Sequence, residues 1–333
     1  MKIGLADVDS HNFPNIPLMK LSAYHKRNGD NVEFAKTGIK YDRLYMSKIF
    51  TESREPEGME AEEVIRGGSG YNLRNRLPEE VEHIYPDYSL YPELTKETAY
   101  GMLTRGCPRK DHGFCITPEK DGCISRKVAD LKEFWNGQKN IILLDQNLLA
   151  CKDRSDLLGQ LRESGAKIDF QGGTDIRFLN GPLIEELRGI KVKDFHFAWD
   201  NPREDLKEKF RLFKESGIKN VDRIGVYVLT NYWSSIEEDL YRVYTLRRMG
   251  FHPYVMIYDK QKFVNQYGKW RAGVERLYTR EQMIHFKTCQ HMQRWSSSRS
   301  VIKICPDFNN YEPYAKWKRS GCPVPGEKKE RDI

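Results

Sequence analysis

The hydrophobic and polar positions along the chain alternate between two patterns. Short apolar runs of strand length recur throughout, and between them lie stretches in which apolar residues have helical spacing. Parallel strands need a covering helix in each connection, so this rhythm predicts a parallel α/β fold. The predicted strands span residues 2–8, 32–35, 44–50, 100–105, 141–144, 168–171, 194–199, 224–229 and 254–258.

Four of the intervening stretches carry the clearest helical spacing, at residues 18–27, 157–164, 206–215 and 240–249. Each is followed by Gly or Asn, which commonly ends a helix because these residues tolerate a left-handed backbone. We expect the helices to stop at Asn28-Gly29, Gly165, Gly217 and Gly250.

The rhythm breaks at residues 84–92, where two Tyr-Pro pairs interrupt it, and a domain boundary is expected there. The predicted domains are residues 1–90, a small α/β domain, and residues 91–290, whose six strands suit a partial or curved barrel. Residues 291–333 form a C-terminal extension that ends in a charged tail.

Charge and composition narrow the class of protein. The chain has 55 basic and 48 acidic residues, a net charge of +7, and these charges are interspersed, which gives only a weak indication of an anionic partner such as nucleic acid. No stretch approaches the roughly 18 apolar residues of a membrane span, and no secretory signal is present. The seven cysteines are an odd number, which favours a reducing, cytoplasmic location where thiols bind metals.

Three of the seven cysteines, Cys107, Cys115 and Cys123, fall within 17 positions directly after a predicted strand. Thiolates gathered on one loop are what a soft metal or an iron-sulfur cluster requires. The alternative is a set of unrelated buried cysteines, but this loop is polar and rich in Gly and Pro and offers little apolar interior.

The residues Thr-Arg-Gly-Cys-Pro-Arg (104–109), leading to Gly-Phe-Cys (113–115), resemble the radical S-adenosylmethionine (SAM) superfamily, specifically members with a cobalamin-binding-like N-terminal domain. The resemblance implies a small Rossmann-like domain followed by a partial (β/α)6 barrel. It also implies a [4Fe-4S] cluster held by a C-x3-C-x2-C motif, SAM on the fourth iron, and an electron donor such as flavodoxin or ferredoxin. Cys107 and Cys115 match the first and last cysteines, and Phe114 matches the aromatic residue near the adenine.

The middle cysteine of that motif is missing, and Asp111 and His112 stand in its place. Either His112 supplies a nitrogen ligand, giving C-x4-H-x2-C, or Cys123 becomes the third ligand in C-x7-C-x7-C. Cys123 is favoured because thiolate is the usual ligand of such clusters. A third possibility is a degenerate, inactive relative.

Polar residues also follow the next predicted barrel strands, where ligands of such folds lie. By resemblance, Asp145 and Asn147 would meet the methionine amine of SAM, and Arg177 would meet its carboxylate. Asp175, two residues before Arg177, is a further candidate for binding SAM, and Asp200 would accept hydrogen bonds from the ribose hydroxyls. Each residue alone could instead cap a helix or form a plain turn.

In the N-terminal domain, Asp9-Ser10-His11 is similar to the D-x-H-x-x-G loop of cobalamin proteins, but Pro14 stands where the glycine belongs. The Gly-rich residues 67–70 resemble the loop under the corrin tail. A polar loop without a cofactor is favoured over cobalamin, because about 85 residues provide a small sheet.

Two rival functions stay open. Cys107, His112, Cys115 and Cys123 could form a closed structural zinc site in a non-catalytic α/β protein. A nucleic-acid-modifying version of the radical enzyme is the other. Hydrolase and kinase functions lack support, because the sequence has no Walker loop, no G-x-S-x-G elbow and no H-E-x-x-H helix.

Overall fold

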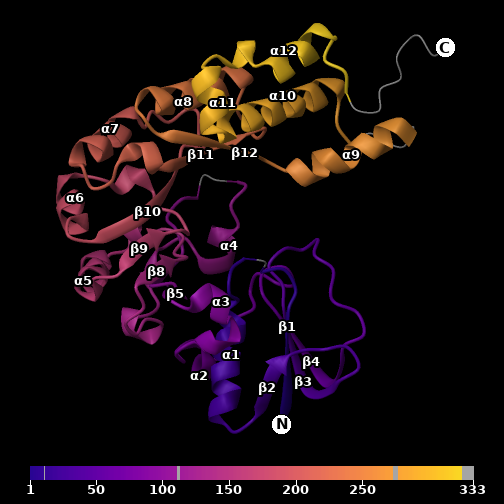
Figure 1. Cartoon of the computed structure of the whole chain (residues 1–333), viewed down its shortest axis with the longest axis vertical. Helices are drawn as coiled ribbons and strands as arrows, with labels where there is room; N and C mark the ends of the chain where they lie inside the picture. Colours follow the sequence, from indigo (N-terminus) through magenta and orange to yellow (C-terminus); the bar gives the residue numbers. More distant parts are fainter. Residues whose placement is uncertain (11, 111–112, 273–276, 325–333) are drawn as a thin grey trace. The chain divides into compact units, whose positions relative to one another are not determined.

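The computed structural model describes residues 1–10, 12–110, 113–272 and 277–324, and the chain divides into two compact units. The first comprises Met1–Thr174 and Glu185–Lys193, and the second comprises Asp175–Ile184 and Asp194–Ile333. Both units combine parallel strands with helices (Figure 1). The predicted α/β class is therefore confirmed, while the predicted boundaries near residues 90 and 290 stay predictions.

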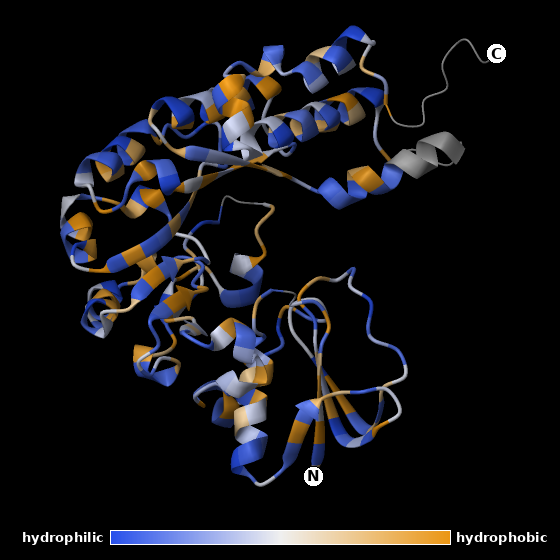
Figure 2. Ribbon diagram, viewed as in Figure 1, coloured by the Kyte–Doolittle hydropathy of each residue, from blue (hydrophilic) through white to orange (hydrophobic). Residues whose placement is uncertain are grey.

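The N-terminal part of the first unit is a four-stranded sheet in the order β2-β1-β3-β4, and all three strand pairs are parallel. The central strand β1 has four consecutive buried residues, Ile3 to Ala6, whereas β3 and β4 mix hydrophobic and hydrophilic residues (Figure 2). The elements are β1 (Lys2–Asp7), α1 (Ile16–Arg27), β2 (Asn31–Phe34), β3 (Lys40–Ser47) and β4 (Glu60–Gly67).

Helix α1 covers one face of this sheet and joins β1 to β2. It begins at Asn15, whose side chain accepts a hydrogen bond from the Leu18 amide at 3.2 Å. The buried Leu18 and Leu21 pack against Ile3 and Leu5 of β1. Full burial of such side chains contributes about 1.5–3 kcal/mol each, so α1 and β1 fold as one layer pair.

Strand β4 was not predicted, because half of its residues are charged. It forms the edge of the sheet, pairs only with β3, and is largely exposed. Charged side chains at an edge discourage pairing with another chain, which explains a strand without an apolar run.

A second parallel sheet of the first unit contains β5, β8 and β9, with β8 in the middle. Helix α5 connects β8 to β9 and ends at Gly165, which has a left-handed backbone as predicted. The elements of this region are α2 (Glu79–Glu82), α3 (Pro92–Thr95), β5 (Thr98–Gly101), β6 (Thr104–Arg105), α4 (Thr117–Asp121), β7 (Arg126–Lys127), β8 (Asn140–Leu143), α5 (Arg154–Ser164) and β9 (Lys167–Phe170).

The prediction of one continuous strand over residues 100–105 is wrong. It is interrupted after Gly101, and the next two residues in strand conformation, Thr104 and Arg105, form β6 and pair with β7 in antiparallel fashion. The break occurs because the amides of Leu103 and Thr104 bond to a buried carboxylate, that of Asp145, instead of continuing the parallel ladder.

The second unit holds β11 between β10 and β12, again all parallel. Helices α8 and α10 pack on β11 and β12 (Figure 1), and stacked or edge-on rings of Phe195, Phe197, Phe210 and Phe213 fill the core beside β10. The elements are α6 (Gly181–Leu187), β10 (Lys191–Ala198), α7 (Lys207–Ser216), β11 (Gly225–Thr230), α8 (Ile236–Arg248), β12 (His252–Ile257), α9 (Lys260–Ala272), α10 (Arg280–Ser297), α11 (Arg299–Ile304) and α12 (Glu312–Arg319).

Candidate cluster-binding loop

The three clustered cysteines lie on one loop of the first unit, between β6 and β7. Cys107 follows β6, Cys115 precedes α4, and Cys123 lies between α4 and β7. All three are free and half-buried. The Cys107 amide donates to the Gly122 carbonyl at 3.2 Å, so the pairing of β6 with β7 extends toward the cysteines and brings Cys107 beside the segment that carries Cys123.

Two glycines let the ends of the loop approach each other. Gly106 has φ 91°, and a Cβ there would lie 2.2 Å from the Ile124 carbonyl oxygen. Gly122, with φ 90°, has no such neighbour: the nearest atom to its Cβ would be in the Arg126 side chain at 3.7 Å. Both need a left-handed backbone, but only Gly106 is also required by close packing of backbone on backbone.

Amide side chains from the loop after β8 contact the cysteine loop directly. Asn147 Nδ2 donates to Cys107 Sγ at 3.4 Å, and Gln146 Oε1 accepts from the Gly106 amide at 3.2 Å. Gln146 Nε2 also donates to Asp121 in α4 at 3.0 Å. Asn147 is 1% exposed, and its Oδ1 has no partner among the described residues. An N–H directed at a thiolate sulfur stabilises its negative charge and tunes a bound metal.

Asp145, which is 3% exposed, anchors the first residues of β6. Its carboxylate accepts from the Leu103 amide at 3.1 Å, from the Thr104 amide at 2.5 Å and from the Thr104 hydroxyl at 2.6 Å. Burial raises the pKa of this carboxyl to about 6, and these hydrogen bonds oppose the rise. Asp145 therefore has a structural contribution to the loop, and its predicted contact with the methionine amine stays a prediction.

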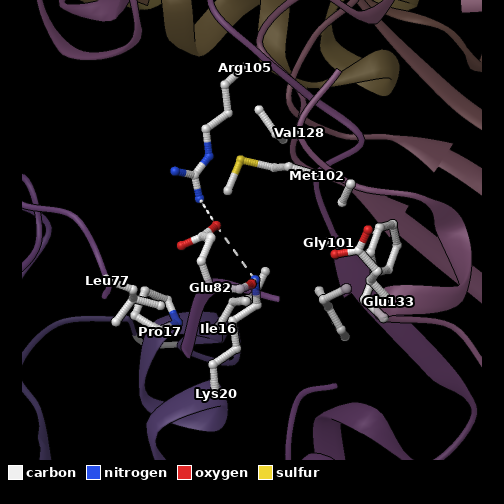
Figure 3. A pocket seen from close by; sticks show the side chains of 13 residues that line it. Ile16, Pro17, Lys20, Leu77, Glu82, Gly101, Met102, Arg105, Val128 and Glu133 are labelled. Atoms are coloured by element: carbon white, nitrogen blue, oxygen red, sulfur yellow. Dashed lines mark hydrogen bonds and ion pairs between the residues drawn. The ribbon is translucent and has the colours of Figure 1, made fainter. Parts of the chain in front are cut away.

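A small cavity of about 50 Å³ is lined by residues of α1, α2 and β6, among them Lys20, Glu82 and Arg105 (Figure 3). Glu82 of α2 reaches across it and pairs with Arg105 of β6 at 2.7 Å and with Lys20 of α1 at 3.6 Å. Burial lowers the pKa of Lys20. These ion pairs connect the strand that begins the cysteine loop with the helices that cover the N-terminal sheet.

Among the residues that the structure describes, the three sulfur atoms of the cysteine loop do not form a group whose members all lie within 4.8 Å of one another. Whether the loop holds an iron-sulfur cluster or a zinc ion therefore stays a prediction. His112 lies outside the described residues.

The remaining residues predicted to bind SAM divide between the two units. Phe114 is half-buried on the cysteine loop, whereas Asp175, Arg177 and Asp200 belong to the second unit. Arg177 donates to Asp175 at 2.9 Å and, through Nε, to Glu204 at 2.6 Å. The second oxygen of Asp175 is buried without a partner among the described residues, so this ion-pair network retains an unused acceptor.

Asp200 follows β10 and fixes the adjacent strand end. Its Oδ1 accepts from the Leu229 amide at 3.2 Å, and its carbonyl accepts from the buried Arg242 guanidinium at 2.7 Å. Arg242 also donates to the carbonyls of Trp199 and Leu229, at 2.7 and 2.9 Å. The carboxyl ends of β10 and β11 are thus tied together by one cation that the sequence analysis did not single out.

The N-terminal loop that is similar to cobalamin proteins has a structural use in this chain. Asp9 accepts hydrogen bonds from the amides of Ile49 and Phe50 at 2.8 and 2.9 Å. Gly68 has φ 96°, and a Cβ there would lie 2.3 Å from the Lys48 carbonyl oxygen. His11 lies outside the described residues. These contacts give Asp9 and Gly68 roles in backbone packing. The preference for a polar loop without a cofactor over cobalamin binding stays a prediction.

A second group of potential metal ligands was missed. Asp239, His285 and Cys289 of the second unit bring one donor atom each to within 4.8 Å of one another. The His-x3-Cys spacing of the last two was a visible signal, because residues four apart share a helix face. Asp239 could not be joined to them from sequence, since it comes from another helix.

Comparisons with known proteins add no assignment. No protein-family model matches the sequence, and no curated protein matches it either. Within the described part of the chain, none of the helices combines the length and the apolar character that crossing a membrane requires.

Proposed function

We propose that this chain is a radical SAM enzyme, built as a small Rossmann-like domain followed by a partial (β/α)6 barrel. Cys107, Cys115 and Cys123 would hold a [4Fe-4S] cluster. When bound, the cluster would supply one electron to SAM, whose reductive cleavage gives methionine and a 5′-deoxyadenosyl radical. An external donor such as flavodoxin or ferredoxin would reduce the cluster. The substrate class is left open.

The observation that carries this proposal is the construction of the loop. Three half-buried thiols lie on one segment whose ends meet through the Cys107 amide and the Gly122 carbonyl. Asn147 donates an N–H to the Cys107 sulfur from a buried position. Such a contact orients a metal ligand and stabilises its thiolate form. A cysteine that only fills space in a hydrophobic core does not require this hydrogen bond.

The choice of Cys123 as third ligand is supported by the same contact. Cys123 directly follows Gly122, whose carbonyl bonds to Cys107. Thiolates are the usual ligands of iron-sulfur clusters, so a C-x7-C-x7-C arrangement satisfies the cluster without His112.

Other residues of the chain have roles that do not depend on electron transfer. Asp145 would fix the start of β6, from which the cysteine loop begins, through the hydrogen bonds that it accepts from residues 103 and 104. In the second unit, Arg177 is a candidate for binding the SAM carboxylate, because a guanidinium forms bidentate pairs with carboxylates. Asp200 is the corresponding candidate for the ribose hydroxyls.

The direct test is an anaerobic assay of reconstituted protein with SAM and dithionite, followed by chromatography for 5′-deoxyadenosine and methionine. Wild type and Cys305→Ala should form both products, since Cys305 lies in the second unit and its thiol donates to the Asp307 carbonyl at 3.2 Å. Cys115→Ala should form neither. Product formation by Cys115→Ala, or none by an iron-loaded wild type, would refute the proposal.

A further inference from the structure

Three chemically different donor groups meet between two helices of the second unit. Asp239 lies on α8, and His285 and Cys289 lie four residues apart on α10. Their donor atoms all lie within 4.8 Å of one another. Residues four apart point to the same side of a helix, so α10 presents an imidazole and a thiol together toward the carboxylate of α8.

Two buried polar atoms of this group lack a hydrogen-bond partner among the described residues. Asp239 and Cys289 are both 0% exposed. Asp239 Oδ2 and His285 Nε2 are buried, and neither has a hydrogen-bond partner among the residues that the structure describes. The Ser234 hydroxyl lies close enough to this carboxylate to favour its charged form. Buried polar atoms are normally paired, so a carboxylate oxygen and an imidazole nitrogen without partners beside a thiol indicate a place for a cation.

The surroundings supply the outer contacts that a metal site requires. Arg242 bonds to the other oxygen of Asp239, Oδ1, and is itself held by the carbonyls of Trp199, Asp200 and Leu229. These contacts fix the orientation of the Asp239 carboxylate and leave its Oδ2 available to bind a metal ion. Metal-binding carboxylates are commonly oriented in this way by hydrogen-bonded neighbours.

The thiol is placed at the carboxyl end of β11, where the Thr230 side chain and the backbone of Asn231 hydrogen-bond to it. Burial raises the pKa of Cys289, so the thiol keeps its proton in the absence of a cation. Binding a divalent ion would form the metal–sulfur bond and release that proton to solvent. The new thiolate adds one negative charge beside the Asp239 carboxylate, which is already paired with Arg242, so the loaded site keeps one net positive charge.

We propose that Asp239 Oδ2, His285 and Cys289 Sγ bind one Zn²⁺ ion, with the fourth position open to water or a ligand. One oxygen, one nitrogen and one sulfur suit zinc, and three protein ligands with an open position are typical of reactive zinc sites. Zinc–ligand bonds of about 2.0–2.3 Å place tetrahedral donors roughly 3.5 Å apart. Small side-chain rotations within the observed 4.8 Å limit are sufficient.

This site is independent of the proposed SAM chemistry, because its ligands lie in the second unit and the cysteine loop lies in the first. It can therefore be tested in full-length protein that carries Cys107→Ala, Cys115→Ala and Cys123→Ala, which removes the loop thiolates. The protein is stripped with chelator, loaded with Zn²⁺ or Co²⁺ under reducing conditions, and dialysed. Metal content is measured by mass spectrometry, and Co²⁺ ligation by absorption spectroscopy.

We expect the triple variant to retain about one zinc per chain and to show a thiolate-to-Co²⁺ charge-transfer band. Adding His285→Gln or Cys289→Ala should weaken binding by more than about tenfold, while His291→Gln, on the same helix but outside the group, should leave it unchanged. Unfolding curves confirm that each variant folds. No retained zinc and no charge-transfer band in the triple variant, or equal zinc in all variants, would overturn the proposal.

Discussion

Replacing Gly106 by Ala tests whether backbone packing shapes the cysteine loop. The new Cβ would lie 2.2 Å from the Ile124 carbonyl oxygen, and neither backbone can yield as a flexible side chain could. The contact is relieved only if residues 121–124 move away. That movement breaks the Cys107–Gly122 backbone bond and the bond from the Gly106 amide to Gln146.

The expected magnitude follows from two contributions. A left-handed backbone costs an L-residue about 1–2 kcal/mol, and each lost hydrogen bond costs about 1 kcal/mol. Gly106→Ala should therefore lower the free energy of unfolding by about 3–4 kcal/mol. Gly122→Ala is the matched control, because its φ is 90° but its Cβ would meet nothing closer than 3.7 Å. Gly122 has ψ 173°, a conformation found almost only for glycine, so Gly122→Ala should lose about 1–3 kcal/mol from backbone strain and keep both hydrogen bonds.

The assay is urea unfolding of the metal-free protein under reducing conditions, together with iron content after anaerobic reconstitution. Gly106→Ala should bind little iron, since its loop can no longer bring Cys107 beside Cys123, whereas Gly122→Ala should bind nearly as much as wild type. Equal losses of stability and equal iron contents in the two variants would show that the loop does not depend on this contact.

Three further changes have defined outcomes. Burial, and then the charges of nearby basic side chains, lower the pKa of His291 from 6.5 to about 4. As the pH falls, His291 is therefore protonated in the unfolded chain before it is protonated in the folded one. Lowering the pH from 7 to 5 should reduce the free energy of unfolding by at most about 2 kcal/mol. His291→Gln should remove that loss, and an unchanged difference between the unfolding free energies at the two pH values would contradict it. Arg242→Leu leaves the buried Asp239 unpaired and should lower the free energy of unfolding by about 3–5 kcal/mol. The control Arg211→Leu, in an exposed ion pair, should lower it by less than about 1 kcal/mol. Similar losses in the two variants would argue against a buried ion pair. Asn147→Ala removes the N–H directed at the loop thiolate and should make the cluster potential more negative in a redox titration; an unchanged potential would exclude that contact.

Much of the fold could be predicted because buried strands carry an uninterrupted apolar signal. Ile141 and Leu143 of β8 are typical: both are fully buried, and the strand was located to within a residue. Strand β4 could not be found, because its charged residues lie at an exposed edge. The break at Leu103 also could not be found, because it depends on a carboxylate 42 residues away in the chain.

The candidate sites divide in the same way. The cysteine loop was visible because its ligands lie close together in sequence. Asn147 was selected for a different partner, and its contact with Cys107 depends on how the loop after β8 packs against the cysteine loop. Asp239 lies 46 residues before His285, and only the packing of α8 against α10 brings the two together.

The central claim is that the loop of Cys107, Cys115 and Cys123 holds a [4Fe-4S] cluster that binds SAM. It is tested most directly by iron and sulfide analysis with electron paramagnetic resonance on anaerobically reconstituted protein, with and without SAM, in wild type, Cys123→Ala and His112→Ala. We predict about four irons per chain, a reduced-cluster signal that SAM perturbs, and loss of iron in Cys123→Ala but not in His112→Ala. Zinc in place of iron, or no metal after careful reconstitution, would contradict the account.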